Sequence, residues 1–282
     1  VFTGLSKYLV DEQVVDSFYA GEDIFADKEE IKLQPNQYVM LVSNSNDKKT
    51  ALARFYNYND PLVKMYKMDD VWGIDARNKE QSFALELLMD PDVEVVSLIG
   101  QAGSGKTLLA VAAGLEQVLG EEQEYKKLIV SRPIQPLGKD IGFLPGTLEE
   151  KMDPWLMPIK DNLEFLLGND RDTVKMYFEK GVIEIEAITY IRGRSITNAF
   201  IIIDEAQNLT RHELKTILTR VGEGTKIILT GDIEQIDNIY IDETSNGLTY
   251  AVEKFKEYDI SGHITLQKGE RSKVATLAAK IL

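Results

Sequence analysis

The stretch GQAGSGKT, residues 100–107, decides the fold, because it matches the pattern G-x-x-x-x-G-K-[ST] of phosphate-binding loops. Its glycines let the backbone curl so that several N–H groups point at one phosphate chain. Lys106 is placed to reach the β- and γ-phosphates, and the hydroxyl of Thr107 is placed to hold Mg²⁺. We therefore predict a nucleoside triphosphate site made by consecutive residues: Gly100, Gln101, Ala102, Gly103, Ser104, Gly105, Lys106 and Thr107.

The segments on either side of this loop have the character that such a loop requires. VEVVSLI (93–99) predicts a strand, and TLLAVAAGLEQVL (107–119) predicts a helix. The amino end of that helix adds roughly half a positive charge at the place where a triphosphate binds. A glycine-rich turn that matched the pattern by chance would not be expected to lie between a strand and a helix.

From Trp72 onward, predicted strands alternate with predicted helices, which favours an α/β fold with a mainly parallel sheet flanked by helices. FIII (200–203) is apolar without alternation, as expected for a strand buried on both faces. The predicted strands are 93–99, 127–131, 182–188, 199–204, 225–231 and 263–266. The predicted helices are 78–89, 106–119, several around 148–179, 210–220, 244–257 and 271–282.

The amino-terminal quarter of the chain lacks this alternation. Residues 1–30 are acidic and mixed, and they predict a linker with a short helix at best. Residues 31–71 contain short β-prone segments separated by Asn, Asp, Ser and Pro, and they predict a small antiparallel β unit. Residues 72–282 are then the nucleotide-binding domain. We expect the β unit to be a structural annex, with a partner surface of its own as the alternative.

An acidic pair ends the most apolar strand. FIIIDEAQ (200–207) places Asp204 and Glu205 where a buried parallel strand would meet the phosphate loop. We predict that Asp204 holds Mg²⁺ through its water shell and that Glu205 polarises the attacking water. This order of acids is typical of triphosphate hydrolases that do mechanical work, whereas a small-molecule kinase needs an acceptor pocket.

Three amide side chains are predicted to contact the nucleotide. Asn78 and Gln81 form the spacing N-x-x-Q at the start of a predicted helix. An amide such as that of Gln81 can donate to and accept from the adenine edge at once, which would select ATP. Gln235 follows TGD (230–232) and is placed to sense the γ-phosphate, with a plain turn capped by Asp232 as the alternative.

Hydrolases of this kind stabilise the transferring phosphoryl group with an arginine. Arg271 is the leading candidate for that contact, in cis or from a neighbouring subunit, with a solvated surface arginine as the alternative. Arg192 and Arg194 are alternatively expected to clamp a nucleic-acid backbone. Arg132 and Arg220 are the other candidates for the contact with the phosphoryl group.

The loop 132–151 is long for a compact domain, and loops of that length are usually functional or disordered. Its residues Lys139, Phe143 and Lys151 suit stacking and charge contacts with single-stranded nucleic acid. A packing excursion or a subunit contact is the alternative.

The composition limits the possible functions. A net charge of −14 disfavours general nucleic-acid binding, although a local basic lining would suffice. There is no cysteine, and His212 and His263 are far apart in sequence, so no zinc pattern exists. The longest apolar run, 108–115, is too short to cross a bilayer, so we expect a cytoplasmic protein without a membrane partner. Val1 in place of an initiating Met leads us to expect a longer natural chain.

Taken together, these motifs resemble the PhoH family of P-loop ATPases, which is related to the core domain of superfamily 1 helicases. The resemblance covers roughly residues 72–282, and its pieces are dense and ordered. They are GIDARNKEQ (73–81), GQAGSGKTLLA (100–110), SRP (131–133), LGKDIGFLPGTLEEKMDPW (137–155), RGRS (192–195), IIIDEAQN (201–208), LTR (218–220), LTGDIEQID (229–237) and GERSKV (269–274).

The resemblance implies a RecA-like fold, ATP with Mg²⁺ as cofactors, hexameric rings of identical subunits, and RNA unwinding in members fused to a PIN nuclease domain. The segment before residue 72 resembles the linker and β unit of such fusions, which implies that an amino-terminal PIN nuclease domain is absent from this sequence. No second RecA-like domain is present, so neighbouring subunits would complete the nucleotide sites.

We therefore expect a Mg²⁺-dependent ATPase that couples hydrolysis to RNA binding and to translocation or unwinding. Lys106, Glu205, Gln235 and Arg271 are the expected catalytic residues, and Thr107 and Asp204 are the expected metal ligands. The alternative is an ATP-driven regulatory switch or assembly ATPase without a nucleic-acid substrate, which agrees better with the acidic charge.

Overall fold

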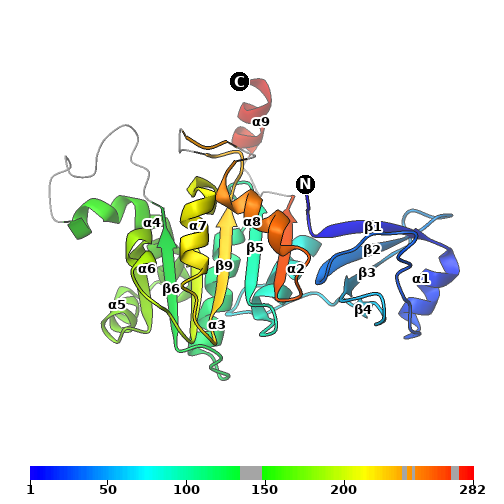
Figure 1. Ribbon diagram of the computed structural model, residues 1–282, viewed down its shortest axis with the longest axis horizontal. Coiled ribbons are helices and arrows are strands. Elements are labelled where there is room, and N and C mark those ends of the chain that lie inside the picture. Colours follow the sequence, from blue (N-terminus) through cyan, green and yellow to red (C-terminus); the bar gives the residue numbers. More distant parts are fainter. Residues whose placement is uncertain (134–147, 237–239, 243–244, 268–272) are drawn as a thin grey trace.

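Two β-sheets organise the chain, a large one with helices on both faces and a small one at the amino-terminal end (Figure 1). The computed structural model describes the chain except for residues 134–147, 237–239, 243–244 and 268–272.

The large sheet has six strands in the order β10-β5-β9-β8-β6-β7, and every neighbouring pair is parallel. All five residues of β8 are buried, as its unbroken apolar sequence predicts. The α/β fold with a mainly parallel sheet is therefore confirmed. The strands are β5 (Val95–Gly100), β6 (Lys127–Arg132), β7 (Ile183–Ala187), β8 (Ala199–Ile203), β9 (Lys226–Gly231) and β10 (Ser261–Leu266).

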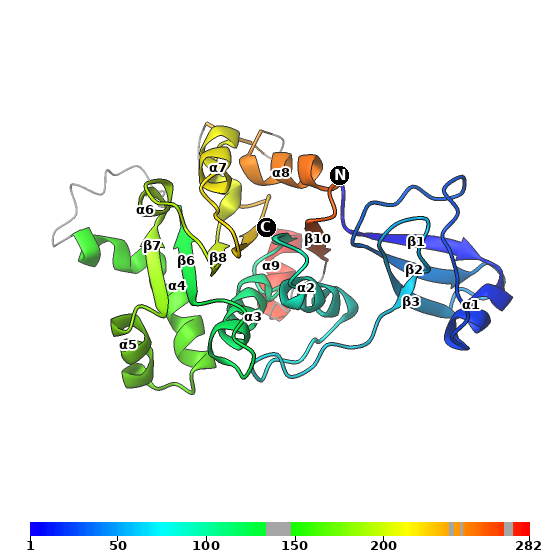
Figure 2. The ribbon, with the colours of Figure 1, turned by 60° about the horizontal axis from the view of Figure 1, so that its bottom comes forward.

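Helices cover both faces of this sheet (Figure 2). Phe200 and Ile202 of β8 belong to one hydrophobic cluster, and Ile201 and Ile203 belong to another, because successive strand residues point to opposite faces. Helices α2, α3 and α4 contribute to the first cluster, while α6, α7 and α8 contribute to the second. The helices are α2 (Lys79–Met89), α3 (Lys106–Leu119), α4 (Leu148–Leu166), α5 (Arg171–Glu179), α6 (Ile188–Arg192), α7 (Arg211–Leu218), α8 (Gly247–Phe255) and α9 (Lys273–Ile281), with a 3₁₀ turn at Ala206–Asn208.

The predicted strands and helices of this domain are present with small shifts at their ends. The short helix α6 (Ile188–Arg192) is an addition that the sequence did not suggest, since its five residues are too few to establish a periodicity. No described helix is long and apolar enough to span a membrane.

The amino-terminal segment is more ordered than predicted. Residues 1–30 predict a linker with a short helix at best, and α1 (Glu12–Tyr19) agrees with that, but Leu5–Val10 forms the unpredicted strand β1. Strand β1 pairs in parallel with β2 (Gln37–Ser43), so the β unit is mixed rather than wholly antiparallel. The remaining strands are β3 (Thr50–Phe55) and β4 (Val63–Lys64), giving the order β1-β2-β3-β4.

A separate small core explains that order. Val15 and Phe18 of α1 pack on Val39 and Phe55 of the sheet, and Tyr8 of β1 is buried beside them. Strand β1 is hard to predict from LSKYLV because its polar residues interrupt the apolar alternation, so its pairing with β2 is settled by tertiary packing.

The two sheets are joined through the carboxyl half of α2. Arg54 of β3 is 2% exposed, and its guanidinium forms ion pairs with Glu86 and Asp90, each at 2.8 Å. Next to it, the rings of Tyr38 and Phe83 are stacked with centroids 4.2 Å apart. Burying a charge is tolerated only when it is paired, so this contact holds the small sheet in one place on α2.

Candidate nucleotide site at the carboxyl edge of the large sheet

The predicted phosphate loop connects the end of β5 to the start of α3. Gly103 and Gly105 have φ angles of 84° and 90°, which favour glycine over other residues. A Cβ at Gly100 would lie 2.5 Å from Ser104 Oγ, and one at Gly105 would lie 3.0 Å from the amide nitrogen of Gln81. The glycines of the motif are therefore required by both backbone conformation and close packing.

Lys106 begins α3 and turns back across this loop. Its side chain is 8% exposed, and Nζ donates to the carbonyl of Gln101 at 3.4 Å. Within the part of the chain that the structure describes, the buried Ser104 Oγ has no hydrogen-bond partner. A curled backbone with a lysine ammonium above it and an unpaired hydroxyl inside it is suited to holding phosphate oxygens.

The predicted metal ligands are in direct contact. Thr107 Oγ1 donates to Asp204 Oδ1 at 3.0 Å, and Thr230 Oγ1 of β9 donates to the same oxygen at 2.6 Å. Asp204 is 3% exposed, and its N–H donates to the carbonyl of Ser131 at 2.8 Å. Because β9 lies between β5 and β8, residues from three strand ends meet at one point.

These residues are chemically suited to Mg²⁺. A hydroxyl and a carboxylate oxygen are hard ligands, and magnesium in nucleotide sites usually takes one or two protein oxygens together with phosphates and waters. Among the described residues there is no group of three or more His, Cys, Asp or Glu that could hold a metal without such help. Thr107 and Asp204 would hold the ion together with a bound triphosphate.

Glu205 is held in an unusual backbone conformation. Its φ angle of 55° lies in the left-handed region, which costs a non-glycine residue free energy and is found preferentially at functional sites. Its carboxylate accepts a 2.6 Å hydrogen bond from Gln207 Nε2. Gln207 therefore holds the carboxylate at this turn.

Gln207 connects this carboxylate to the loop after β9. The side chain is fully buried, and Nε2 also donates to the carbonyl of Gln235 at 3.0 Å, while Oε1 accepts from the N–H of Asp232 at 3.2 Å. The predicted sensor Gln235 thus meets the acidic pair through its main chain, and its own side chain is exposed. Sequence reasoning missed Gln207, although its place three residues after Asp204 is the signal that could have found it.

Arg132 lies on the acidic pair. Its guanidinium is 3.5 Å from Asp204 Oδ2 and 3.2 Å from Glu205 Oε1, and Nη1 donates to the carbonyl of Trp155 in α4 at 2.8 Å. This arginine was one of five considered from the sequence. Its position at the end of β6, next to β8, brings it to the site.

Asn78 and Gln81 lie at the amino end of α2, beside the loop. Asn78 Oδ1 accepts from the N–H of Gln81 at 2.9 Å and caps the helix. Gln81 Nε2 donates to the carbonyl of Ser104 at 3.1 Å, and Oε1 accepts from the N–H of Arg77 at 2.9 Å. The Gln81 amide therefore ties α2 to the phosphate loop, and its predicted contact with adenine remains a prediction.

The other candidates are distributed as follows. Gln101 Nε2 donates to Glu234 at 3.1 Å, which draws the loop after β9 toward the phosphate loop. Arg194 forms ion pairs with Glu184 at 3.0 Å and Glu186 at 3.6 Å, so the structure gives it a structural partner. Three predicted residues lie outside the described residues: Arg271, Lys139 and Phe143. The side chains of Arg192 and Lys151 also lie outside the described part.

Ion pairing and burial shift the pKa values of the two carboxylates next to Arg194, Glu184 and Glu186. Although burial opposes it, hydrogen bonds from Lys127 and Arg194 lower the pKa of Glu184. Burial and the neighbouring charge of Glu184 raise the pKa of Glu186. The arginine thus stabilises two adjacent carboxylates on β7.

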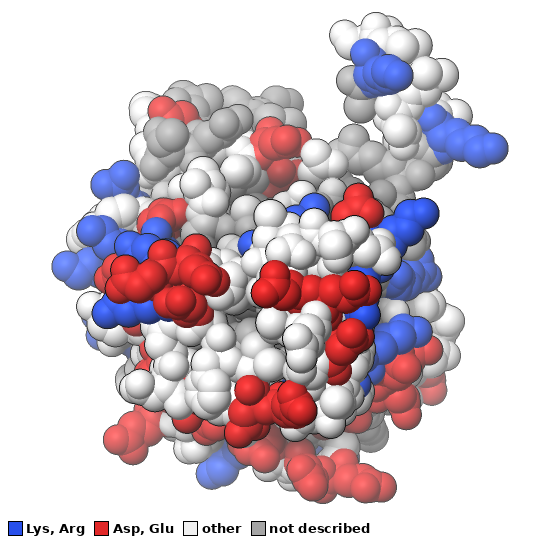
Figure 3. Space-filling view, turned by 90° about the vertical axis from the view of Figure 1, so that its right-hand side faces the viewer, with Lys and Arg blue, Asp and Glu red and all other residues white. Residues whose placement is uncertain are grey.

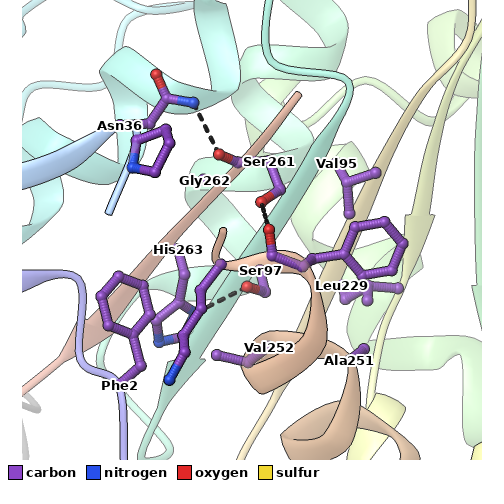
Figure 4. A pocket seen from close by; sticks show the side chains of 13 residues that line it. Phe2, Asn36, Val95, Ser97, Leu229, Ala251, Val252, Ser261, Gly262 and His263 are labelled. Atoms are coloured by element: carbon purple, nitrogen blue, oxygen red, sulfur yellow. Dashed lines mark hydrogen bonds between the residues drawn. The ribbon is translucent and has the colours of Figure 1, made fainter. Parts of the chain in front are cut away.

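A small crevice between β5, β10 and α8 is not a ligand site. It is lined by Phe2, Asn36, Ser97 and His263, among others, and has room for only about 10 Å³, roughly one water (Figure 4). His263 is buried between Ser97 Oγ at 2.7 Å and Thr265 Oγ1 at 2.9 Å. Burial lowers its pKa to about 4, so the imidazole is neutral and structural.

A phosphate loop that faces the acidic end of another strand of the same parallel sheet is the arrangement of P-loop nucleotide-binding proteins, and this chain has it. Comparison with known proteins makes the assignment more specific. Residues 73–281 match the family described as PhoH-like protein, and the chain belongs to the PhoH family. The resemblance to the PhoH family drawn from the motifs is confirmed, whereas the fusion to a PIN nuclease domain stays a prediction.

The chain is similar to several members of that family. Protein PhoH2 of Bacillus subtilis (strain 168) is 49% identical over 289 residues, covering 100% of this chain and 64% of that protein. A PhoH-like protein of the same organism is 43% identical over 166 residues, covering 59% of this chain and 50% of that protein. The chain therefore spans less than two thirds of the length of these relatives.

Solved structures are more distant. A Pif1 helicase from Candida albicans shares 16% identity at a TM-score of 0.38, covering 73% of this chain and 43% of that one. A likeness at that level says nothing about substrate.

Proposed function

We propose that the chain hydrolyses ATP with Mg²⁺ and couples the reaction to movement along single-stranded RNA. The observation that best supports the hydrolytic step is the 3.0 Å contact of Thr107 with Asp204, with Glu205 next in sequence in a left-handed backbone conformation. These groups meet beside the phosphate loop, where a bound nucleotide would place its γ-phosphate.

The proposed mechanism is in-line attack by water on the γ-phosphate. Lys106 and the loop N–H groups hold the phosphate oxygens, and Glu205 orients the water. A magnesium ion held by Thr107 and Asp204 would neutralise developing charge. Gln207 positions Glu205 and connects it to the backbone of Gln235, so the loop after β9 is suited to sense the phosphate.

Other parts of the proposal rest on the family. Asn78 and Gln81 are proposed to lie at the adenine, and Arg271 is proposed to contact the phosphoryl group within the chain or from a neighbour. We further propose hexameric rings, a cytoplasmic location, and a PIN nuclease domain in the natural protein. Residues 72–282 would then be the ATPase domain of that longer chain.

A second candidate is a regulatory or assembly ATPase that binds no nucleic acid. The net charge of −14 favours it, because an acidic surface repels phosphate backbones.

The RNA dependence of the ATPase rate separates the two candidates. We expect single-stranded RNA to raise the steady-state rate at low salt, and the stimulation to fall as salt rises because counterions compete for the basic contacts. Hydrolysis without any stimulation at low salt would favour the second candidate and leave the ATPase assignment in place.

A further inference from the structure

An exposed aromatic and basic cluster surrounds Lys64 of the edge strand β4, with Tyr19 at the end of α1 and Tyr66 just after β4. The Lys64 ammonium is 5.0 Å from the ring centroid of Tyr19 and 5.5 Å from that of Tyr66. The two tyrosines are 53% and 70% exposed, so neither ring belongs to the core. A lysine between two accessible ring faces presents a cation and stacking surfaces side by side.

A groove of about 610 Å³ continues from this cluster toward α2. Leu52, Met65 and Phe83 make its apolar floor, and the last two are buried. Lys67 lines it from the small sheet, and Arg77, Asn78 and Lys79 line it from the start of α2. We call these residues, together with Tyr19, Lys64 and Tyr66, the Tyr66 groove. Because Asn78 is also proposed to lie at the adenine, the groove borders the proposed site of the nucleotide base.

The charge of this groove differs from that of the chain as a whole. Its lining includes three cations and one anion, Asp75, whereas the chain carries a net charge of −14. Lys79 pairs with the buried Glu80 at 3.3 Å, so its charge is partly compensated. Lys67 also pairs with Asp69 at 3.4 Å, but both side chains are more than half exposed, and such pairs contribute little free energy. Figure 3, which faces the small sheet, shows basic side chains at the left and right edges and acidic ones over the middle, along the bottom and among the basic ones.

We propose that the Tyr66 groove binds a single-stranded nucleic acid, with bases on the tyrosine rings and phosphates on Lys64 and Lys67. Alternating ring faces and cations are what a flexible strand requires, because every base has a stacking face and every linkage has a charge. The proposal rests on the RNA dependence proposed above and places the polymer on the small sheet.

Two hydrogen bonds connect this groove to the nucleotide site. Arg77 lines the groove, and its N–H donates to Gln81 Oε1 at 2.9 Å. The other end of that amide donates to the carbonyl of Ser104 in the phosphate loop at 3.1 Å. A bound nucleic acid that shifts the start of α2 would therefore also shift the phosphate loop. In this way the polymer could change the rate of ATP hydrolysis.

Fluorescence anisotropy with a labelled strand of about 12 nucleotides tests the stacking contact. RNA and DNA of one sequence are compared at low salt. Tyr66→Ala should bind the preferred strand roughly 5- to 100-fold more weakly, since losing one stacked base has an effect of that order. Tyr66→Phe keeps the ring and should bind as the parent does, and Tyr258→Ala, which removes an exposed tyrosine outside the groove, should also bind normally.

The salt dependence tests the phosphate contacts. The double variant Lys64→Gln/Lys67→Gln should lower the slope of log affinity against log salt by about 1.4, since each lost phosphate contact on a single strand contributes about 0.7. Lys175→Gln/Lys180→Gln, which removes two charges at α5 and its end, should leave the slope unchanged.

Each contrary outcome has a distinct meaning. If the parent binds strands but the Tyr66 and lysine variants bind equally well, the groove is the wrong site and the RNA dependence survives. If Tyr66→Ala lowers affinity for ATP and not for the strand, the groove holds the nucleotide base instead. If the parent binds neither RNA nor DNA at low salt, both the groove proposal and the RNA dependence fail, while hydrolysis without a polymer would keep the ATPase.

Discussion

The two sheets of this chain carry their chemistry in different ways. In the large sheet the polar residues follow the ends of parallel strands, and all parallel strands end at one edge, so Thr107, Asp204 and Thr230 meet there. In the small mixed sheet the exposed rings and the lysine gather at the edge strand β4, which is only two residues long. A parallel sheet thus brings its motifs together by topology alone, whereas the surface of a mixed sheet depends on which strands pair.

The two ends of α2 are held by different kinds of contact. Its amino end contacts the phosphate loop through a hydrogen bond from the neutral amide of Gln81. Its carboxyl end is held by ion pairs with the buried Arg54. Near Arg54, Lys226 Nζ donates to the carbonyls of Leu87 and Asp90, each at 2.6 Å, and burial lowers its pKa to about 7. We therefore expect α2 to be held by buried ion pairs where it meets the small sheet and by neutral hydrogen bonds where it meets the phosphate loop.

The largest effect is expected at the large sheet. Glu205→Gln should keep ATP binding and reduce turnover by about 10²- to 10⁴-fold, the usual contribution of a positioned base. The amide has the same shape and can keep the contact with Gln207, so folding should be preserved. Steady-state hydrolysis measures turnover and calorimetry measures binding. A rate equal to the parent's would remove Glu205 from the proposed role.

The second largest effect is expected on stability, at the contact of Arg54 with α2 between the two sheets. Arg54→Met should lower the free energy of unfolding by about 3 to 5 kcal/mol, because it leaves Glu86 and Asp90 facing a buried site without their cation. Urea denaturation measures the change. The matched control is Arg171→Met, whose pair with Glu164 is exposed and should be worth less than about 1 kcal/mol. Equal effects of the two variants would mean that Arg54 does not hold the sheets together.

A smaller effect is expected from the buried histidine behind β5. The pKa of His263 is lowered from 6.5 to about 4, so the unfolded chain binds a proton that the folded chain does not as the pH falls through this window. Stability contributed by the neutral imidazole is therefore present above pH 6.5 and is lost toward pH 4, by about 3 kcal/mol.

The variant His263→Gln cannot titrate and should lose that part of the pH dependence. Denaturation at several pH values between 4 and 6.5 measures it against the parent. His212→Gln, on the exposed side of α7, is the matched control for the replacement of a histidine by glutamine. A parent and a His263→Gln variant with parallel pH profiles would contradict the burial argument.

Sequence patterns anticipated the large sheet and much of its site. GQAGSGKT and FIIIDEAQ carry both local conformation and chemistry, and the apolar strands between them allow one parallel arrangement of the motifs. Arg132 and Gln207 were harder, because their roles arise from which strands become neighbours and from a turn that a single sequence does not specify. Strand β1 was missed because LSKYLV has no clear alternation, and its partner β2 is about thirty residues away along the chain.

The most direct test of the nucleotide site is the binding of ATP by calorimetry in the presence of Mg²⁺, compared between the parent and Lys106→Ala. The parent should bind, and the variant should show no measurable binding, because the ammonium proposed to hold the phosphates is gone while the fold remains. Lys175→Ala, which removes an exposed lysine of α5, should bind as the parent does. Equal dissociation constants for the parent and Lys106→Ala would contradict a nucleotide site at GQAGSGKT.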